Sequence, residues 1–205
     1  MVLLLTVSIA SAQNLLVNPG FDVGPAGGYS IPTGWGQFGN AWCEGSWAPF
    51  VPLSPPNVTN MYGNFWCTDC FNVSGIFQEF ASVEGDMWEM SSNARHASSD
   101  PMIGSQATGG NWVVQKIAFF DAGSNEIGGV ESMILDGSFA TDTWFASGLI
   151  TGTAPAGTAK VQALILYLQP SMDGGAAHID NVYFAAAPTV PVEKGTWGAI
   201  KALYN

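Results

Sequence analysis

The chain has 205 residues, of which 47% are hydrophobic and only 10% are charged, with 25 glycines and 12 prolines. This length suits one domain with a single core, and the apolar fraction excludes a disordered chain. The net charge is −11 with only five lysines and arginines. This balance excludes nucleic acid as a partner, because such binding needs basic patches. Neutral ligands and Ca²⁺ suit the acidic composition.

The sequence begins with an apolar run, MVLLLTVSIASA (1–12), that ends in Ala-Ser-Ala. An apolar stretch of this length before small residues is typical of a secretory signal. No Lys or Arg precedes the run, so the true start would lie upstream; the alternative is a first buried strand. The signal predicts a secreted protein, extracellular or at the cell surface. No membrane insertion is expected after signal removal, because the other long apolar run, 161–168, is too short to span a bilayer.

Short apolar stretches then follow one another, separated by Gly, Pro, Asn and Asp turn signals at intervals of ~10 residues. We expect strands over residues 14–18, 58–66, 75–80, 87–96, 111–120, 127–135, 143–151, 161–169 and 178–184. Within 87–96, Trp88, Met90 and Ala94 alternate with polar residues, as in a half-buried strand. Pro170 and a Gly-rich cluster separate the last two strands, which predicts an antiparallel hairpin. The pattern predicts an all-β, two-sheet antiparallel sandwich over residues 13–185.

The composition changes after the predicted domain, where residues 186–205 form a linker and a C-terminal tail. Ala and Pro dominate the linker, and Trp197, Ile200 and Leu203 are spaced for one face of a short helix. This amphipathic tail is a candidate for self-association.

Three cysteines, Cys43, Cys67 and Cys70, fit an extracellular protein with one structural disulfide, whose pairing stays open. Cys67 and Cys70 have CxxC spacing, but no helix follows them, as a redox site would need. A zinc site would lack further Cys or His ligands.

Five segments occur in an order that is shared with a known family. They are NLLVNPGFDVG with a following GW, GIFQEF with GDMWEMSSNARH, KIAFFDAGSNEIG, TDTWFASGLITGTAPAGTAKVQALILYLQ, and HIDNVYF. This ordered set resembles the galactose-binding-like jelly rolls, and among them the carbohydrate-binding modules attached to xylanases and β-glucanases. The likeness covers about Asn14 to Phe184. It implies a two-sheet jelly roll that is not an enzyme, binds a polysaccharide or oligosaccharide, and holds a structural Ca²⁺.

In the resembled family the cation joins the first and last strands through one acid from each. Asp22 and Asp180 match these positions, with Asp22 where Glu is common and Asn181 where a second Asp is common. The physical argument agrees, because a carboxylate inside the last strand needs a partner, and a cation is one. The alternative is that Asp180 caps a turn through backbone N–H groups while Asp22 is solvated.

Sugar binding needs flat aromatic surfaces and planar polar groups. Four tryptophans lie in or beside polar, Gly-containing loops and are the candidates for an aromatic platform: Trp42, Trp47, Trp66 and Trp112. Candidate polar contacts on the strands are Arg95, Gln115 and Gln169. Which face each side chain takes stays open, because a register slip of one residue reverses every side chain of a strand.

Two other functions compete with glycan binding. The first is an extracellular structural subunit, of a surface layer or a filament, built on the same jelly roll. The second is a glycoside hydrolase, because Glu84, Asp86 and Glu89 have ExDxxE spacing that resembles the active-site strand of laminarinase-type glycosidases. Gly85 and Asp86, however, indicate a turn rather than a continuous strand, so we expect no catalysis.

Overall fold

The structure is a computed structural model that describes residues 13–25, 30–45, 50–55, 57–62, 71–171 and 173–188. The predicted signal, residues 189–205 of the predicted linker and tail, and Trp47, Trp66, Cys67 and Cys70 lie outside these residues. In the described part of the chain, no helix has the length and apolar character needed to cross a membrane.

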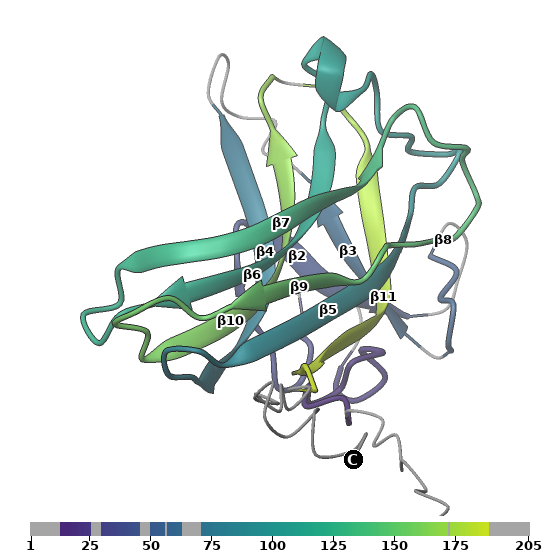
Figure 1. The fold of residues 1–205 in the computed structure, drawn as a ribbon. Coiled ribbons are helices and arrows are strands. Elements are labelled where there is room, and N and C mark those ends of the chain that lie inside the picture. Colours follow the sequence, from purple (N-terminus) through teal and green to yellow (C-terminus); the bar gives the residue numbers. More distant parts are fainter. Residues whose placement is uncertain are drawn as a thin grey trace, which may run out of the picture.

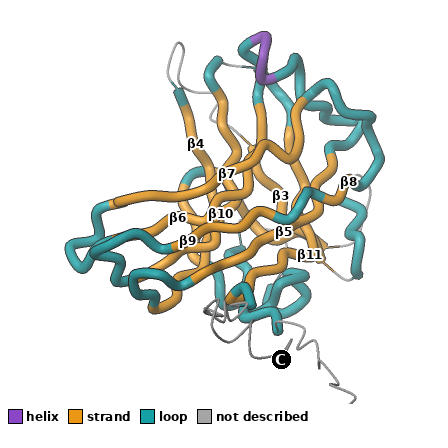
Figure 2. Tube along the Cα trace, viewed as in Figure 1, coloured by secondary structure: helices purple, strands orange, loops and turns teal. Residues whose placement is uncertain are grey.

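The described residues form two antiparallel sheets packed face to face, which confirms the predicted all-β sandwich (Figures 1 and 2). Sheet A has the order β1-β4-β10-β6-β7, and sheet B has the order β2-β3-β11-β5-β8, with β9 also paired to β5. The strands are β1 (Gly36–Phe38), β2 (Asn40–Gly45), β3 (Asn57–Tyr62), β4 (Asn72–Ala81), β5 (Met87–Arg95), β6 (Trp112–Phe120), β7 (Glu126–Asp136), β8 (Phe145–Ala146), β9 (Ile150–Thr153), β10 (Lys160–Gln169) and β11 (Ala176–Ala186).

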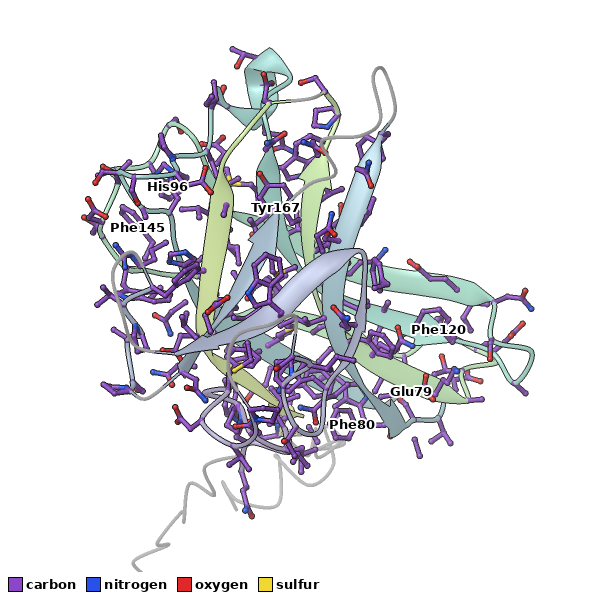
Figure 3. All side chains as sticks on the ribbon, turned by 180° about the vertical axis from the view of Figure 1, so that it is seen from behind. Glu79, Phe80, His96, Phe120, Phe145 and Tyr167 are labelled. Atoms are coloured by element: carbon purple, nitrogen blue, oxygen red, sulfur yellow. The ribbon has the colours of Figure 1, made fainter. Side chains whose placement is uncertain are left out.

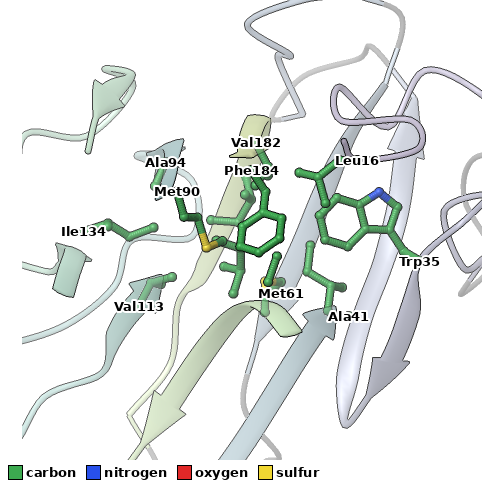
Figure 4. Close-up of a cluster of buried hydrophobic side chains, with 14 of the residues drawn as sticks. Leu16, Trp35, Ala41, Met61, Met90, Ala94, Val113, Ile134, Val182 and Phe184 are labelled. Atoms are coloured by element: carbon green, nitrogen blue, oxygen red, sulfur yellow. The ribbon is translucent and has the colours of Figure 1, made fainter. Parts of the chain in front are cut away.

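Side chains from alternate strand positions fill the space between the sheets (Figure 4). On β6 and β10 the odd-numbered residues point inward and are fully or almost fully buried, and the even-numbered residues point outward. Trp88, Met90 and Ala94 are buried on the inner side of β5 as predicted. Trp88 stacks on Phe184 of β11, with ring centroids 5.0 Å apart. This core fixes which side chains of each strand point outward, although Val114, Ala118 and Leu164 among them are also buried.

The predicted hairpin between 161–169 and 178–184 was wrong. β10 pairs with β4 and β6 in sheet A, whereas β11 pairs with β3 and β5 in sheet B. The Gly-rich connection therefore crosses between the sheets, and buried polar side chains hold it. Tyr167 Oη donates to the Gly175 carbonyl at 2.7 Å, and Asn111 Nδ2 donates to the Asp173 carbonyl at 2.7 Å.

Two other predicted strands differ from the structure. Residues 14–18 do not form a regular strand, but they lie along β11, where Leu15 N donates to the Phe184 carbonyl at 2.8 Å. The predicted strand over 143–151 is divided into β8 and β9. The division falls where Ser147 and Gly148 bond to Gln115, which reaches across from sheet A. In both places side-chain hydrogen bonds replace part of the predicted backbone ladder: the Asn14 side chain bonds to Val182 and Phe184 of β11, and Gln115 bonds to Ser147 and Gly148.

Candidate functional site

The outer face of sheet A presents a graded surface, apolar at one end and polar at the other. Strand register places its side chains in rows across the sheet. One row contains Phe38, Leu166, Val114 and Met133, and the next contains Phe77, Leu164 and Lys116. A third row brings Glu79 beside Gln162. The face therefore joins an aromatic and aliphatic half to a half with charges and an amide.

Aromatic rings at the apolar end lie over glycines of the neighbouring strand, and the Phe38 and Phe77 rings are tilted by 39° to each other. A Cβ added to Gly75 would collide with the Phe38 ring, and one added to Gly36 would collide with the Phe77 ring. The Phe38 side chain is nevertheless 39% exposed, so one side of its ring meets solvent. Trp112 lies on the same face at the edge of the apolar half, with the exposed Phe71 ring 6.2 Å away between centroids. Aromatic rings that face solvent are the kind of surface on which the apolar face of a sugar stacks.

The polar end of this face is a network of short contacts. Glu79 Oε2 accepts from Gln162 Nε2 at 3.0 Å and from Lys160 Nζ at 2.9 Å. These hydrogen bonds, with that of Lys160 the larger, lower the pKa of Glu79. Lys160 also lies 5.6 Å above the Phe120 ring, and Figure 3 shows Glu79 and Phe120 toward the same end of the sandwich. Hydroxyl groups of a sugar could replace such exposed side-chain partners.

Part of the outer face of sheet B is covered. Residues 50–55, which we call the strap, lie across β5 and β11. The Val51 carbonyl accepts from Trp144 Nε1 at 3.1 Å and from Arg95 at 3.4 Å, and the Phe50 ring lies 5.2 Å from that of His178. Arg95 is only 4% exposed and His178 only 2%, although both point outward. Burial, and then the nearby Arg95 charge, lowers the pKa of His178 to about 3. The strap thus buries the part of this face that carries Arg95 and His178.

Oxygen atoms of Asp22, Asp180 and Asn181 converge next to Gly20. An ideal Cβ on Gly20 would lie 2.8 Å from Asp22 Oδ2, 3.3 Å from Asn181 Oδ1 and 3.6 Å from Asp180 Oδ1. The backbone around this point is strained, with positive φ at Asn18, Phe21 and Asn181. The N-terminal segment and the last strand thus meet here, side by side, as the sequence predicted.

Asp180 itself is fully buried, and its environment favours the protonated carboxyl group. Burial raises the pKa of Asp180 to about 6, against three backbone N–H bonds that lower it, and the Asp22 charge adds to the rise. Among the described residues no three His, Cys, Asp or Glu side chains gather, so a cation here would need the Asn181 amide and carbonyl or water oxygens as well. The donor set is nonetheless all oxygen, which suits Ca²⁺.

The five predicted glycan contacts that the structure describes are not brought together. Trp112 lies on the outer face of sheet A, whereas Trp42 and Arg95 lie on the outer face of sheet B, where Trp42 Nε1 donates to Glu44. Gln115 and Gln169 point into the sandwich and are at most 1% exposed, so their prediction as surface contacts was wrong. Gln115 instead binds Ser92, Ser147 and the Gly148 carbonyl. Trp47 and Trp66 lie outside the described residues.

The sequence did not predict the phenylalanines of sheet A as part of the site, because the predicted aromatic platform consisted only of tryptophans in or beside loops. The signal was present as Gly36 and Gly75 on neighbouring strands of the sheet, since a glycine in a strand marks a place where another group approaches the backbone. It also missed the strap, because five of its six residues are apolar or proline and carry no ligand-binding pattern.

The acids of the alternative glycosidase motif do not share a strand. Glu84 lies in the exposed turn before β5, and Glu89 lies on β5 and accepts from Tyr183 Oη at 2.7 Å. Cys43 is a buried free thiol, and burial raises its pKa to about 11. Cys43 therefore takes no part in the predicted disulfide, and no disulfide occurs among the residues that the structure describes.

No protein-family model and no curated protein sequence matches the chain. Solved structures do share the fold. The chain is similar to the CBM22-1 xylan-binding domain of Xyn10C from Paenibacillus barcinonensis, with TM-score 0.51 and 13% identity over 88% of this chain and 99% of that one. It is also similar to TmCBM61, solved with β-1,4-galactotriose, with TM-score 0.50 and 15% identity over 86% of this chain and 100% of that one.

A third similar structure is the enzymatically active domain of tailspike protein 4 from bacteriophage CBA120, with TM-score 0.54 and 13% identity. That match covers 85% of this chain but only 21% of the tailspike chain. At these identities the comparisons establish the fold, which is the jelly roll of carbohydrate-binding modules.

Proposed function

We propose that the protein is a secreted, non-catalytic carbohydrate-binding module that binds a glycan on the outer face of sheet A. The observation that carries the proposal is the pair of glycine-backed phenylalanine rings, Phe38 and Phe77, in rows beside the Glu79–Gln162 pair. Rings of this kind stack on the apolar face of a pyranose, and planar polar groups bind its hydroxyls. The similar fold of modules that are named for xylan or solved with galactotriose supports the proposal.

The proposal includes a structural Ca²⁺ held by Asp22, Asp180 and Asn181. Their oxygens converge on one point beside Gly20, a cradle that a Cβ would fill. A bound cation would neutralise two neighbouring carboxylates and tie the N-terminal segment to β11. We expect thermal unfolding at a higher temperature in CaCl₂ than in EDTA, and an unchanged midpoint would argue against the cation.

Affinity electrophoresis through gels that contain a soluble polysaccharide tests the glycan proposal directly. We expect a neutral polysaccharide such as xylan, β-1,4-galactan or a β-glucan to retard the protein, and isothermal titration with its oligosaccharide to give saturable binding. Bovine serum albumin serves as the non-binding reference in each gel. Unretarded migration in every gel, by protein whose circular dichroism shows the folded state, would contradict the proposal.

One feature favours the alternative of an extracellular structural subunit. β7 is an 11-residue edge strand of sheet A with Ile127, Val130 and Met133 each at least 36% exposed. A long apolar edge can pair with another chain. Light scattering across a range of concentrations separates the two functions, because a filament or layer subunit grows with concentration whereas a module that binds glycan alone stays one size.

A further inference from the structure

Both strand residues of the candidate cation site contact the strap with the opposite end of the same side chain. Asp180 turns Oδ1 toward Asp22 and Gly20, while its Oδ2 accepts from the backbone N–H groups of Leu53 at 2.7 Å and Ser54 at 2.9 Å. We propose that cation binding at this site fixes the strap over sheet B. The inference rests on the cation site of the proposed function and adds a conformational consequence to it.

Asn181 repeats the arrangement through its side-chain amide. Its Oδ1 faces the point beside Gly20, and its Nδ2 donates to Ser54 Oγ at 2.8 Å. An amide that directs its oxygen at a cation must direct its nitrogen away, and here the nitrogen meets the strap. Asn181 has positive φ and lies in the β-bulge of β11, so the backbone holds both side chains in this orientation.

Electrostatics gives the direction of the coupling. Asp22 Oδ2 and Asp180 Oδ1 approach a common point, and like charges in such a place repel one another. A cation between them removes the repulsion and holds both carboxylates in their present orientation. Asp180 Oδ2 is thereby kept in place as the acceptor of the Leu53 and Ser54 N–H groups. Cation binding therefore strengthens the contact with the strap.

The other end of the strap covers a second surface. Phe50 packs on His178, and the Val51 carbonyl accepts from Arg95 and Trp144. Val51 and Leu53 are 50% and 42% exposed, so the strap has little other packing on its outer side. Loss of the Asp180 contact would loosen the strap and expose Arg95 and His178, the buried basic groups of this face. Cation binding would thereby control whether Arg95 and His178 on the outer face of sheet B are exposed in addition to the outer face of sheet A.

Hydrogen exchange on the full chain, freed of metal with EDTA and then dialysed, tests the coupling with Ca²⁺ alone as the probe. We expect saturating Ca²⁺ to slow exchange of the Leu53 and Ser54 amides roughly tenfold, within the range typical of coupled sites. The Trp144 indole N–H signal should shift in the same titration. The matched control is the Asn125 amide, which donates to Asp121 Oδ1 at 2.9 Å in the turn between β6 and β7 and should not change.

Coupling is reciprocal, so a strap residue outside the cation site should alter cation affinity. Ser54→Ala removes the acceptor for Asn181 and should weaken Ca²⁺ binding several-fold by calorimetry, whereas Ser132→Ala on β7 should not. If Ca²⁺ binds but the strap amides exchange at an unchanged rate, the coupling is wrong and the cation site stands. If Ca²⁺ does not bind, both are wrong, and the gel assay still decides glycan binding independently.

Discussion

The two outer faces of this sandwich have the same backbone architecture but differ in how far their outward-pointing side chains are exposed to solvent. On sheet A, large side chains such as Phe38 remain open to solvent, next to the polar pair Glu79 and Gln162. On sheet B, Arg95 and His178 point outward yet are buried, because the strap crosses them. Outward direction on a strand therefore does not by itself make a residue available to a ligand, because a covering segment can bury it. The proposed binding face is sheet A, where no such segment lies over the Phe38 ring among the described residues.

The largest effect should come from the residue that holds the strap. Asp180→Ala leaves three backbone N–H groups, of Leu53, Ser54 and Asn181, without their carboxylate acceptor. We expect a loss of at least about 3 kcal/mol in unfolding free energy, since each unsatisfied buried group costs about 1–3 kcal/mol. Urea denaturation in metal-free buffer measures it.

Asp22→Ala is the matched control, because Asp22 is exposed and, among the described residues, accepts one long bond, from Asn57 N at 3.4 Å. Its loss without metal should stay below about 1 kcal/mol. Equal losses in the two variants would mean that the strap does not depend on Asp180.

The pH dependence of stability tests whether the strap keeps water away from the His178 imidazole. His178 has its pKa lowered to about 3 in the folded protein, against about 6.5 when unfolded. Below pH 6.5 the unfolded chain binds a proton that the folded chain does not, so stability falls as pH falls, by about 1.4 kcal/mol per pH unit. We expect a loss of about 2 kcal/mol between pH 6.5 and 5.

His178→Gln removes this titration, so the difference between the stability curves of the two proteins isolates His178. Asp180 is present in both proteins, so its own titration cancels in the difference. Parallel curves down to pH 5 would show that water reaches the imidazole, and that sheet B is not sealed.

A smaller effect should separate two glutamines of sheet A. Gln162 faces outward and bonds Glu79, whereas Gln115 faces inward and is fully buried. Gln162→Ala should weaken glycan binding several-fold, about 1 kcal/mol, with stability nearly unchanged.

Gln115→Ala changes the inward-facing glutamine and should lower stability while leaving glycan binding unchanged. It leaves Ser92, Ser147 and the Gly148 carbonyl without their partner, so we expect a loss of about 2 kcal/mol in stability and full binding by the folded fraction. Titration calorimetry and urea denaturation on both variants give the two numbers. A binding loss in Gln115→Ala alone would place the ligand elsewhere.

Much of the fold could be predicted from sequence because alternation and turn residues act locally. The long strands β5, β6, β7 and β10 lie within a few residues of their expected ranges. The partner of each strand could not be predicted in the same way. The run from β10 to β11 carries hairpin signals, but a crossing between sheets uses the same Gly-rich turn residues, and only the buried Tyr167 and Asn111 bonds distinguish it.

One part of the candidate site could be predicted from the sequence and another part could not. The meeting of Asp22 and Asp180 was predicted, because a resemblance placed both acids in chain order. The binding face was not, because register determines the face and no local pattern fixed it: Gln115 and Gln162 are both polar residues in apolar strands, yet they point in opposite directions. The covering of Arg95 by the strap is a tertiary contact that strand periodicity does not report.

A paired tryptophan experiment tests most directly whether sheet A is the binding face. Trp112 lies on the outer face of sheet A and Trp42 on that of sheet B, so each serves as the control for the other. With the polysaccharide that retards the unmodified protein, we predict that Trp112→Ala weakens binding 10-fold or more, about 1.4 kcal/mol or above, and that Trp42→Ala binds as before. Full binding by Trp112→Ala together with loss in Trp42→Ala would contradict the account and move the glycan to sheet B.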